Sequence, residues 1–333
     1  MADVHDLARM VARLVPQSGF FETPVPGLWL IRADMPGVPM PTVYEPSLCL
    51  IVQGAKTVSL GARLLEYDDA HSLVASVDLP LVGRVVSATP DRPYLCCKID
   101  IDQTMLADLI AAEPGPLPPG DPPALAVHPT GADLLEAAFR LLRLQERPAS
   151  IAVLAPLVQR EILYYLLHGP QSAMLRHAAS ANSHLGRVAR AIAWIRDHAH
   201  EQLRIAEVAA AAHMSASSLH QHFKRITGLT PLQFQKQLRL HEARHLMTAR
   251  GINAGSAGFA VGYDSPSQFS REYRRLFGAP PRTDIAGVAR SLQPVSGGPS
   301  SRLRREPDQC GCGDVLPDNR TSSISQSRRR SAR

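Results

Sequence analysis

The 333-residue sequence lacks the marks of a membrane or secreted protein. It contains no run of about eighteen or more apolar residues, so no membrane-spanning helix is expected. Its first residues, MADVHDLARMVARLV, do not place a basic region before an apolar one, which argues against a signal peptide. The sequence therefore predicts a cytoplasmic protein that makes no contact with a membrane.

Cysteine is also scarce. The five cysteines are Cys49, Cys96, Cys97, Cys310 and Cys312. Their spacing fits no four-ligand zinc site, and an odd number in a cytoplasmic chain argues against a set of structural disulfides. We therefore expect reduced thiols, no bound metal and no cofactor.

Motifs for catalysis are missing as well. No nucleophile elbow, phosphate-binding loop or dinucleotide fingerprint occurs in the sequence. A metal enzyme built on a small β-barrel would need clustered histidines and carboxylates, yet the only histidine between Gly27 and Asp100 is His71. Enzymatic function is therefore not expected, and a cupin-type metal enzyme is the least favoured alternative.

What the sequence does have is an uneven distribution of charge. Residues 1–184 contain 13 Lys and Arg against 19 Asp and Glu, whereas residues 185–284 contain 14 against 7. An acidic first part joined to a basic second part is expected when only the second part meets a polyanion.

From Gly27 to Asp100 the sequence consists of short, strand-like segments. They are rich in β-branched residues and read LWLIRA, SLCLIVQG, KTVSLG, SLVAS, LVGRVV and LCCKIDID. Strand-length runs this closely spaced predict a small β-barrel or sandwich. The proline-rich residues 113–123 follow as a loop, because proline lacks a backbone donor.

Two helices are expected after this loop. Residues 131–145 place their apolar side chains on one face, at Leu134, Leu135, Ala138, Leu141 and Leu142. Residues 150–169 are apolar over much of the helix circumference, so they must be covered by their own domain or by a second subunit. The small, polar residues 170–184 are expected to form a linker, and residues 292–333 a disordered basic tail.

Residues 203–228 predict two short helices joined by a tight turn. The inward side chains are Ile205, Val208, Ala209 and Ala212 in the first helix and Leu219, Phe223 and Ile226 in the second. Ser215 is a suitable N-cap for the second helix and Gly228 ends it. Such a pair is a helix-turn-helix unit, whose second helix can lie in the major groove of DNA. The outward side chains of that helix are Ser217, Ser218, His220, Gln221, Lys224 and Arg225.

The same pattern returns fifty residues later. Asp264 or Ser265 caps the helix PSQFSREYRRLFG, in which Phe269, Tyr273 and Leu276 take the inward places. Between the two units, Thr230 and Pro231 begin a longer helix. A rigid helix between two such units would let both recognition helices enter successive segments of the major groove. The first helix of the second unit contains Gly255 and Gly258, each of which costs about 1 kcal/mol relative to Ala in a helix.

Residues 185–285 resemble the DNA-binding domain of the AraC/XylS family of bacterial transcription regulators. The resemblance rests on IAEVAAAAHMSASSLHQHFKRITGLTPLQFQKQLRLHEARHLM and on FAVGYDSPSQFSREYRRLFGAPP. Residues 24–110 resemble the N-terminal domain of one branch of that family, through VYEPSLCLIVQGAKTVSLG, YDDAHSLVASVDLPLVG and DRPYLCCKIDID. The resemblance implies an α+β chain, with a cupin-like β-barrel and helical hairpin followed by an all-α domain that carries two helix-turn-helix units.

The resemblance also implies a division into domains. Residues 1–23 form an N-terminal helix or arm, and residues 24–169 a cupin-like domain for effector sensing and dimerisation. The linker 170–184, the DNA-binding domain 185–285 and the tail 292–333 follow. The implied partners are operator DNA, a small-molecule effector, RNA polymerase and a second copy of the chain, and activation is the expected mode of regulation.

Carried over by position, the family's base-reading places fall on Ser217, His220, Gln221, Ser267, Ser270 and Arg271. Arg271 is the strong guanine reader among them, because its guanidinium can reach two acceptors. The phosphate contacts are assigned to Lys224, Arg225, Arg274 and Arg275.

Two questions stay open at this level. A small molecule inside the barrel is the leading input signal, and an electrophile or oxidant acting on Cys49, Cys96 or Cys97 is the alternative. Neighbouring residues of a strand point to opposite faces, so only one of Cys96 and Cys97 can face the barrel interior. An architectural, nonspecific DNA-binding protein is disfavoured by the two discrete recognition helices and the acidic first part.

Overall fold

The computed structural model describes residues 3–292, and the tail predicted for residues 292–333 lies almost entirely outside the described residues. The described chain begins with helix α1 (Val4–Leu14), whose N-cap Asp3 forms a capping box with Asp6. Leu7 and Val11 of this helix are fully buried and pack into the main hydrophobic core. The N-terminal segment is thus part of the packed structure rather than a free arm.

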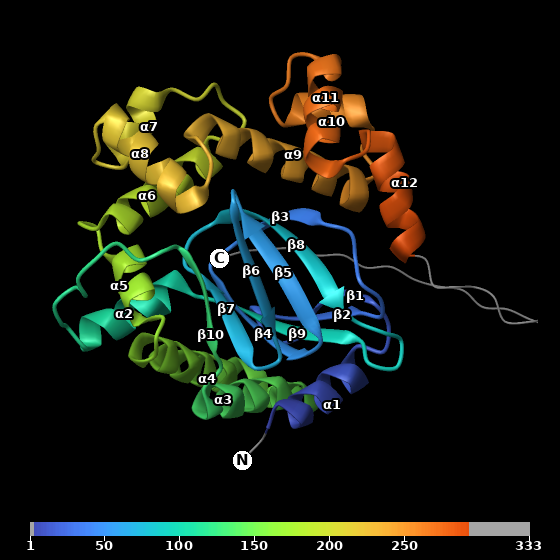
Figure 1. Cartoon of the computed structure of the whole chain (residues 1–333), viewed down its shortest axis with the longest axis vertical. Helices are drawn as coiled ribbons and strands as arrows, with labels where there is room; N and C mark the ends of the chain where they lie inside the picture. Colours follow the sequence, from blue (N-terminus) through green and yellow to red (C-terminus); the bar gives the residue numbers. More distant parts are fainter. Residues whose placement is uncertain (1–2, 293–333) are drawn as a thin grey trace, which may run out of the picture. The chain divides into compact units, whose positions relative to one another are not determined.

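Ten antiparallel strands form two sheets (Figure 1). The six-stranded sheet has the order β1 (Gly19–Glu22), β2 (Leu28–Ala33), β9 (Tyr94–Asp100), β4 (Ser47–Gln53), β7 (His71–Ala75) and β10 (Leu125–Pro129). The four-stranded sheet has the order β3 (Met40–Tyr44), β8 (Leu79–Ser87), β5 (Ala55–Leu60) and β6 (Arg63–Asp68). The predicted β-architecture is confirmed, and all six predicted segments are strands.

The central strands are buried on both faces. In β4 every residue from Ser47 to Val52 is buried, which fits its position between β9 and β7 and beneath helices. Strand β6, at the edge of the smaller sheet, buries only Tyr67. A strand in the middle of a covered sheet needs a continuous apolar run, whereas an edge strand does not.

Three helices and a short 3-10 turn complete the N-terminal part. They are α2 (Gln103–Ala112), α3 (Ala132–Arg143), the turn Leu144–Glu146 and α4 (Pro148–His168). Helices α3 and α4 pack against each other as the expected hairpin. The predicted stripe of α3 is buried at Leu134, Ala138, Leu141 and Leu142.

Helix α4 is covered by its own domain on one side and is exposed on another. Ile151, Ala155, Ile162, Leu163, Leu166 and Leu167 are buried within the chain. Val153, Leu154, Leu157 and Tyr164 remain exposed. Among the described residues α4 is the one helix long and apolar enough to cross a membrane by length and composition. Because one face packs into the core, we interpret it as a core helix with an exposed apolar side.

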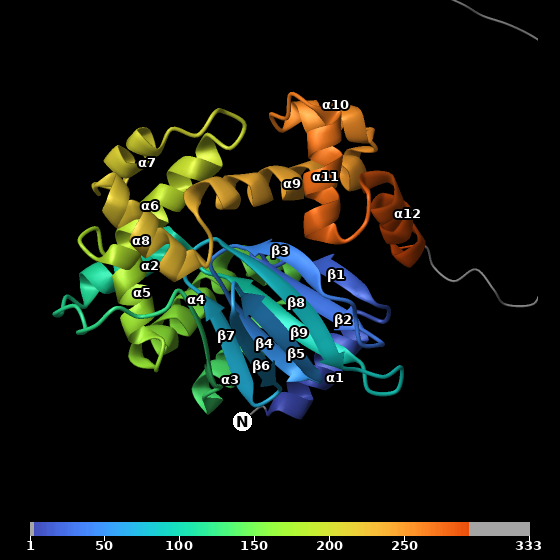
Figure 2. The same ribbon diagram turned by 45° about the horizontal axis from the view of Figure 1, so that its top comes forward.

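The remaining helices form the C-terminal part (Figure 2). They are α5 (Ser172–Ala179), α6 (His184–Asp197), α7 (Ile205–Ala211), α8 (Ala216–Thr227), α9 (Pro231–Arg250), α10 (Ala254–Ala260), α11 (Pro266–Phe277) and α12 (Pro281–Leu292). Residues 170–184, predicted to be a linker, include helix α5, whose Met174 and Leu175 are buried. Helix α11 ends at Phe277 with Gly278 as its cap, and α12 begins at Pro281.

Candidate nucleic-acid interface

The first helix-turn-helix unit consists of α7 and α8. The Ser215 hydroxyl accepts a hydrogen bond from the Ser218 amide and caps α8. Gly228 ends the helix in a left-handed conformation, with φ of 73°. In the turn His213 has φ of 51°, a conformation unusual for a residue other than glycine. The predicted inward residues Leu219, Phe223 and Ile226 are all buried.

The second unit, α10 and α11, has the same construction with a longer turn. The Ser265 hydroxyl, fifty residues beyond Ser215, caps α11 by accepting from the Gln268 amide. Gly278 ends this helix with φ of 81°. The recognition helices are related by an offset of fifty residues, but the first helices and their turns are related by an offset of 49. The Gly262 amide donates to the Phe259 carbonyl in the second unit, as the His213 amide donates to the Ala210 carbonyl in the first. One extra residue therefore lies between turn and cap.

The two glycines of α10 have different surroundings. A Cβ on Gly255 would meet only the Asn253 side chain, at 3.4 Å. A Cβ on Gly258 would lie 3.0 Å from the ring of Phe269, in the recognition helix. Gly258 therefore permits the close approach of α10 to α11, a packing role that helix propensity does not reveal.

Helix α9 joins the two units and is hydrogen-bonded to the loop after α6 and to the turn of the second unit. The Arg239 guanidinium donates to the carbonyls of Ala199 (2.6 Å) and Glu201 (2.7 Å), which follow α6. It also donates to the carbonyl of Gly262 (2.9 Å), in the turn of the second unit. The Gln235 amide adds a bond to the Glu201 carbonyl (2.8 Å). These charge-assisted bonds fix the turn of the second unit to the loop beyond α6.

Two acidic groups beside the second recognition helix, Glu272 of α11 and Asp284 of α12, are held by partners on α9 and on the second unit. The Glu272 carboxylate accepts hydrogen bonds from Lys236 (2.7 Å), Tyr263 (2.8 Å) and Gln268 (3.3 Å). Burial raises the pKa of Glu272, but these donors outweigh it and the net pKa is lowered. Asp284 accepts from Arg244 (2.8 Å) and from Tyr273 (2.7 Å). The negative charges of Glu272 and Asp284 are thus compensated by Lys236 and Arg244 of α9.

The residues assigned to DNA lie on the outer side of both recognition helices. The exposed residues are Ser217, His220, Gln221, Lys224 and Arg225 in α8, and Ser267, Ser270, Arg271, Arg274 and Arg275 in α11. Within residues 3–286, the side chains of Lys224, Arg271, Arg274 and Arg275 make no hydrogen bond or ion pair. These four cations are therefore available to a polyanion.

Arg225 differs from the other cations. It forms a short ion pair with Asp121, which lies in the loop before β10. Its guanidinium also donates to Nδ1 of His222 (3.0 Å). The predicted phosphate contact at Arg225 would have to replace this pairing.

The interior of the β-domain contains two of the three candidate thiols. Cys96 lies opposite Ile51 in the β4–β9 pair, whereas Cys97 lies opposite Leu50. Cys96 therefore shares its face with Cys49, and Cys97 faces the helices. A hydrogen bond from Cys49 lowers the pKa of Cys96, burial opposes this, and the Lys56 ammonium lowers it further. Burial raises the pKa of Cys97 to about 12.

The same interior holds a lysine and three tyrosines. Lys56 lies on the face of β5 that also carries buried Val58 and Leu60. Its ammonium donates to the Tyr44 hydroxyl (2.6 Å). The hydroxyls of Tyr67 and Tyr94 are buried and have no hydrogen-bond partner within the described residues. The space between the two sheets therefore contains a lysine ammonium and tyrosine hydroxyls among apolar side chains.

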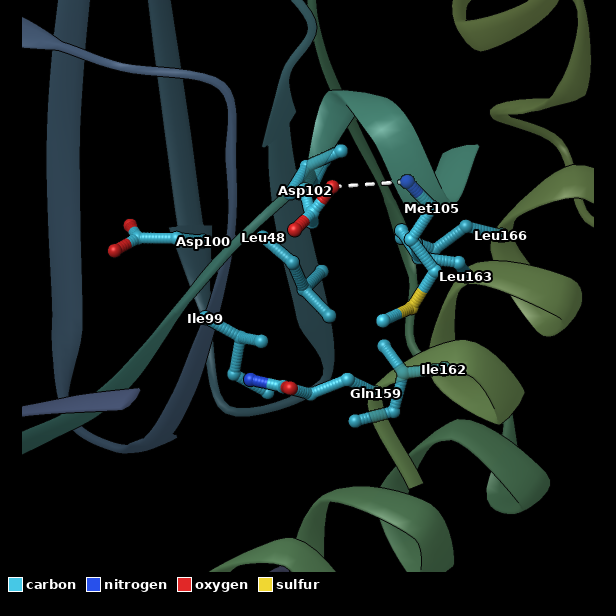
Figure 3. Close-up of a pocket in the computed structure, with 10 residues that line it drawn as sticks. Leu48, Ile99, Asp100, Asp102, Met105, Gln159, Ile162, Leu163 and Leu166 are labelled. Atoms are coloured by element: carbon cyan, nitrogen blue, oxygen red, sulfur yellow. Dashed lines mark hydrogen bonds between the residues drawn. The ribbon is translucent and has the colours of Figure 1, made fainter. Parts of the chain in front are cut away.

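A separate small cavity lies outside the sheets. It measures about 20 Å³, room for a single water molecule, and lies where the ends of β4 and β9 meet α2 and α4 (Figure 3). Figure 3 shows Leu48, Ile99, Met105 and Ile162 turned toward it and the Asp100 carboxylate turned away. Its size and apolar lining make it a packing defect rather than an effector site.

Comparison with known families finds a matching family model for each of the two parts of the chain. Residues 24–174 match the AraC-type transcriptional regulator N-terminus, and residues 208–285 match a helix-turn-helix domain. The chain belongs to the AraC family of transcriptional regulators. This agrees with the resemblance seen in the sequence.

Curated AraC-family relatives include transcriptional activators. The HTH-type transcriptional activator RhaS of Escherichia fergusonii is 30% identical over 161 residues, 48% of this chain and 57% of that protein. RhaS of Klebsiella pneumoniae is 33% identical over 135 residues, 40% of this chain and 48% of that protein. The chain spans about half the length of the curated relatives it matches.

Solved structures share the fold over most of the described chain. ToxT of Vibrio cholerae bound to (E)-4-(8-methylnaphthalen-1-yl)but-3-enoic acid matches with a TM-score of 0.56 and 10% identity, over 78% of this chain and 97% of that one. ToxT bound to an unsaturated fatty acid matches with a TM-score of 0.55 and 10% identity, over 78% and 93%. At this identity the likeness concerns the fold alone, which confirms the predicted α+β class.

Proposed function

We propose that this chain is a transcription activator that binds operator DNA through α8 and α11 and responds to a small molecule in its β-domain. The main support is the pair of capped recognition helices, which lie fifty residues apart in the sequence. They expose Lys224, Arg271, Arg274 and Arg275, whose side chains have no partner among residues 3–286. The internal compensation of Glu272 and Asp284 supports the same conclusion, since it leaves the exposed charge positive. RhaS, named as an activator, supports the mode of regulation.

Within this proposal the outward residues divide into two groups. Ser217, His220 and Gln221 in α8, and Ser267, Ser270 and Arg271 in α11, contact base edges. Lys224, Arg225, Arg274 and Arg275 contact phosphates. The first group would set sequence preference, and the second would set affinity and its dependence on salt.

The test is selection of bound fragments from the source genome, followed by fluorescence anisotropy on the recovered site and on a scrambled version. Specific binding should exceed nonspecific binding by a factor of about 10³ or more at the same salt concentration. Equal affinity for the two duplexes would instead indicate an architectural DNA-binding protein. Transcription from the recovered promoter in vitro then distinguishes activation from repression.

We propose that the effector carries an acidic group. Lys56 supplies a cation on the inward face of β5, and the unpaired hydroxyls of Tyr67 and Tyr94 supply further donors. The two ToxT ligands named above are both carboxylic acids, which supports the same ligand class. Thermal-shift screening with carboxylic acids of graded size should find compounds that raise Tm for the unaltered chain and not for Lys56→Gln. Lys98→Gln, at the other lysine of this domain, is the matched control, and an equal response of Lys56→Gln would refute the assignment.

A thiol-based signal is the second candidate. The lowered pKa of Cys96, beside Cys49 and Lys56, favours addition of its thiolate to an electrophile. Both thiols are buried, so an electrophile would have to enter the domain first. Promoter responses of Cys96→Ser and Cys49→Ser that equal the response of the unaltered chain would exclude this mechanism.

The remaining partners follow from the same proposal. An activator works in the cytoplasm with RNA polymerase, and we propose no catalytic role. The exposed apolar residues Val153, Leu154, Leu157 and Tyr164 of α4 provide a surface on which a second copy could pack. Sedimentation should detect a dimer that Leu157→Glu converts to a monomer, and a monomeric unaltered chain would contradict this.

A further inference from the structure

Three side chains with metal-binding atoms converge beside the first recognition helix. His184 is the first residue of α6, His222 lies in α8, and Asp121 comes from the loop before β10. Their ligand atoms all lie within 4.8 Å of one another. The three residues are far apart in sequence and come from three different elements, so the fold itself brings them together.

The two imidazoles already face each other. Their ring centroids are 3.7 Å apart and the rings are inclined by only 12°. The Arg225 guanidinium, which can only donate, donates to Nδ1 of His222, so this nitrogen presents a lone pair. An imidazole nitrogen with a lone pair is the donor that binds metals.

We propose that Asp121, His184 and His222 form a binding site for a first-row divalent transition ion such as Zn²⁺. Two imidazoles and a carboxylate, with water as the fourth ligand, are a ligand set that zinc accepts in tetrahedral sites. Bonds of about 2.0–2.2 Å place two such ligand atoms about 3.4 Å apart, so the three ligand atoms must move closer together and the stacked imidazoles must turn until their in-plane lone pairs converge. His184 and Asp121 are exposed, so their side chains have room to turn once Asp121 leaves Arg225 and His184 leaves its stack on His222. Spacing along the chain predicts no metal site, because the three residues are brought together only by the fold.

Metal binding would replace the Arg225 guanidinium by a metal ion as the partner of Asp121 and His222. In the metal-free arrangement the Asp121 carboxylate binds Arg225, and the His222 Nδ1 lone pair accepts from the same guanidinium. A divalent ion would take both of these groups and release the Arg225 guanidinium from Asp121 and His222. The ion would connect the loop before β10 with α6 and α8, and would free a cation on the DNA-facing helix.

The test is Zn²⁺ binding to the untagged full-length chain, measured by competition with a chromophoric chelator. All proteins carry Cys310→Ser and Cys312→Ser to remove those two thiols. The reference protein should bind one ion, and His184→Ala and Asp121→Asn should weaken binding by about ten-fold or more. His222→Gln, which keeps the side-chain volume, should do the same. Co²⁺ in place of Zn²⁺ should give the visible absorption of a tetrahedral site, which the His184→Ala protein lacks.

Two matched variants separate this site from adventitious binding. His245→Ala removes an exposed histidine of α9 and should leave the affinity unchanged. Arg225→Gln removes the competing guanidinium and should increase the affinity several-fold. Equal Zn²⁺ affinity in the reference, His184→Ala and Asp121→Asn proteins would overturn the proposal. So would weaker binding by Arg225→Gln, since that result would make the ion pair a support of the site rather than its competitor.

Discussion

The two helix-turn-helix units repeat one local design but belong to different cores. The inward residues Leu219, Phe223 and Ile226 of the first unit are part of the large core that also contains the β-domain. The second unit has a separate small core, with Phe269 and Tyr273 packed against α9. The same local sequence pattern therefore produces one unit integrated into the main core and one that is largely self-contained.

The charges of the two units differ in the same way. Arg225 and Arg275 hold equivalent positions, yet Arg225 is paired with Asp121 and Arg275 has no partner within residues 3–286. The end of α8 also touches the β5–β6 turn, where a Cβ on Gly228 would lie 3.1 Å from the Gly61 nitrogen. Arg196 of α6 pairs with the buried Asp78 (2.8 Å). A change in the β-domain can thus reach the first unit at these contacts, whereas the second unit meets the β-domain where α11 lies beside β3 and through α9.

The separation of the cores is tested most strongly by Phe269→Ala. Removing this buried ring should cost about 3–5 kcal/mol, enough to open a small core on its own. Hydrogen exchange should then accelerate in α10 and α11 and stay slow in α7, α8 and the β-domain. The control is Leu219→Ala at the equivalent position, which should accelerate exchange in α8 and its neighbours. A uniform increase with either variant would mean that one core supports both units.

Beside the second core lies a half-buried histidine, His241 of α9. Burial lowers the pKa of His241 to about 4, the positive charge of Arg244 adds to this, and the ring packs edge-on against Phe277. The unfolded chain binds this proton near pH 6.5, so stability is complete above that pH and falls as the pH decreases toward 4. Between pH 7 and pH 5 the loss should be about 2 kcal/mol, measured by urea unfolding. His241→Gln should flatten this dependence, and a slope shared by His241→Gln and the unaltered chain would assign it elsewhere.

Base reading should be stronger in the second unit. Arg271 and Gln221 hold equivalent positions, and arginine makes the stronger two-pronged contact, with guanine. Arg271→Ala should cost about 1–3 kcal/mol on the selected site and relax preference at one base pair. Arg274→Ala should weaken all sequences alike. Equal losses for Arg271→Ala on specific and random DNA, measured by anisotropy, would remove Arg271 from the base-reading group.

The paired and unpaired arginines give a more subtle contrast. Arg275→Ala should reduce the slope of log K against log salt by about 1, because one phosphate contact is lost. Arg225→Ala should reduce it less, since this arginine must first leave Asp121. In an Asp121→Asn background, Arg225→Ala should reduce this slope as much as Arg275→Ala does. Identical slopes for the two alanine variants would show that the ion pair does not compete with DNA.

The smallest expected effect concerns the glycines of α10. Gly255→Ala should stabilise the second unit by about 0.5–1 kcal/mol, because its Cβ enters nearly open space. Gly258→Ala should give no such gain, because its Cβ would press on the Phe269 ring. Thermal unfolding of the two variants measures the difference. A gain at Gly258 as large as that at Gly255 would mean that Phe269 moves aside freely.

Sequence reasoning was most accurate where a signal is local. The N-caps Ser215, Thr230 and Ser265 and the helix-ending glycines Gly228 and Gly278 were all predicted and are confirmed. Caps and periodic apolar residues act within a few residues of the helix they define, so one segment contains the whole signal. The assignment of DNA contacts stays a prediction, since only a complex with DNA tests it.

The missed elements have weak local signals. Strands β1, β3, β6 and β10 are short, polar or contain proline, and they are strands because neighbouring strands supply hydrogen-bond partners. Helix α5 is rich in small and polar residues and is ordered by the burial of Met174 and Leu175. In each case a distant part of the chain supplies the stabilising contacts.

The sequence alone determined the two-part organisation, the α+β class, both recognition helices and the exposed cations on them. These follow from periodicity, capping and charge, which are properties of neighbouring residues. Only the tertiary structure decided that Cys96 shares a face with Cys49, that Gly258 packs on Phe269 and that Asp121 meets His184, His222 and Arg225. The physical reason is that these contacts depend on strand register and helix packing, which bring together residues that no local pattern relates.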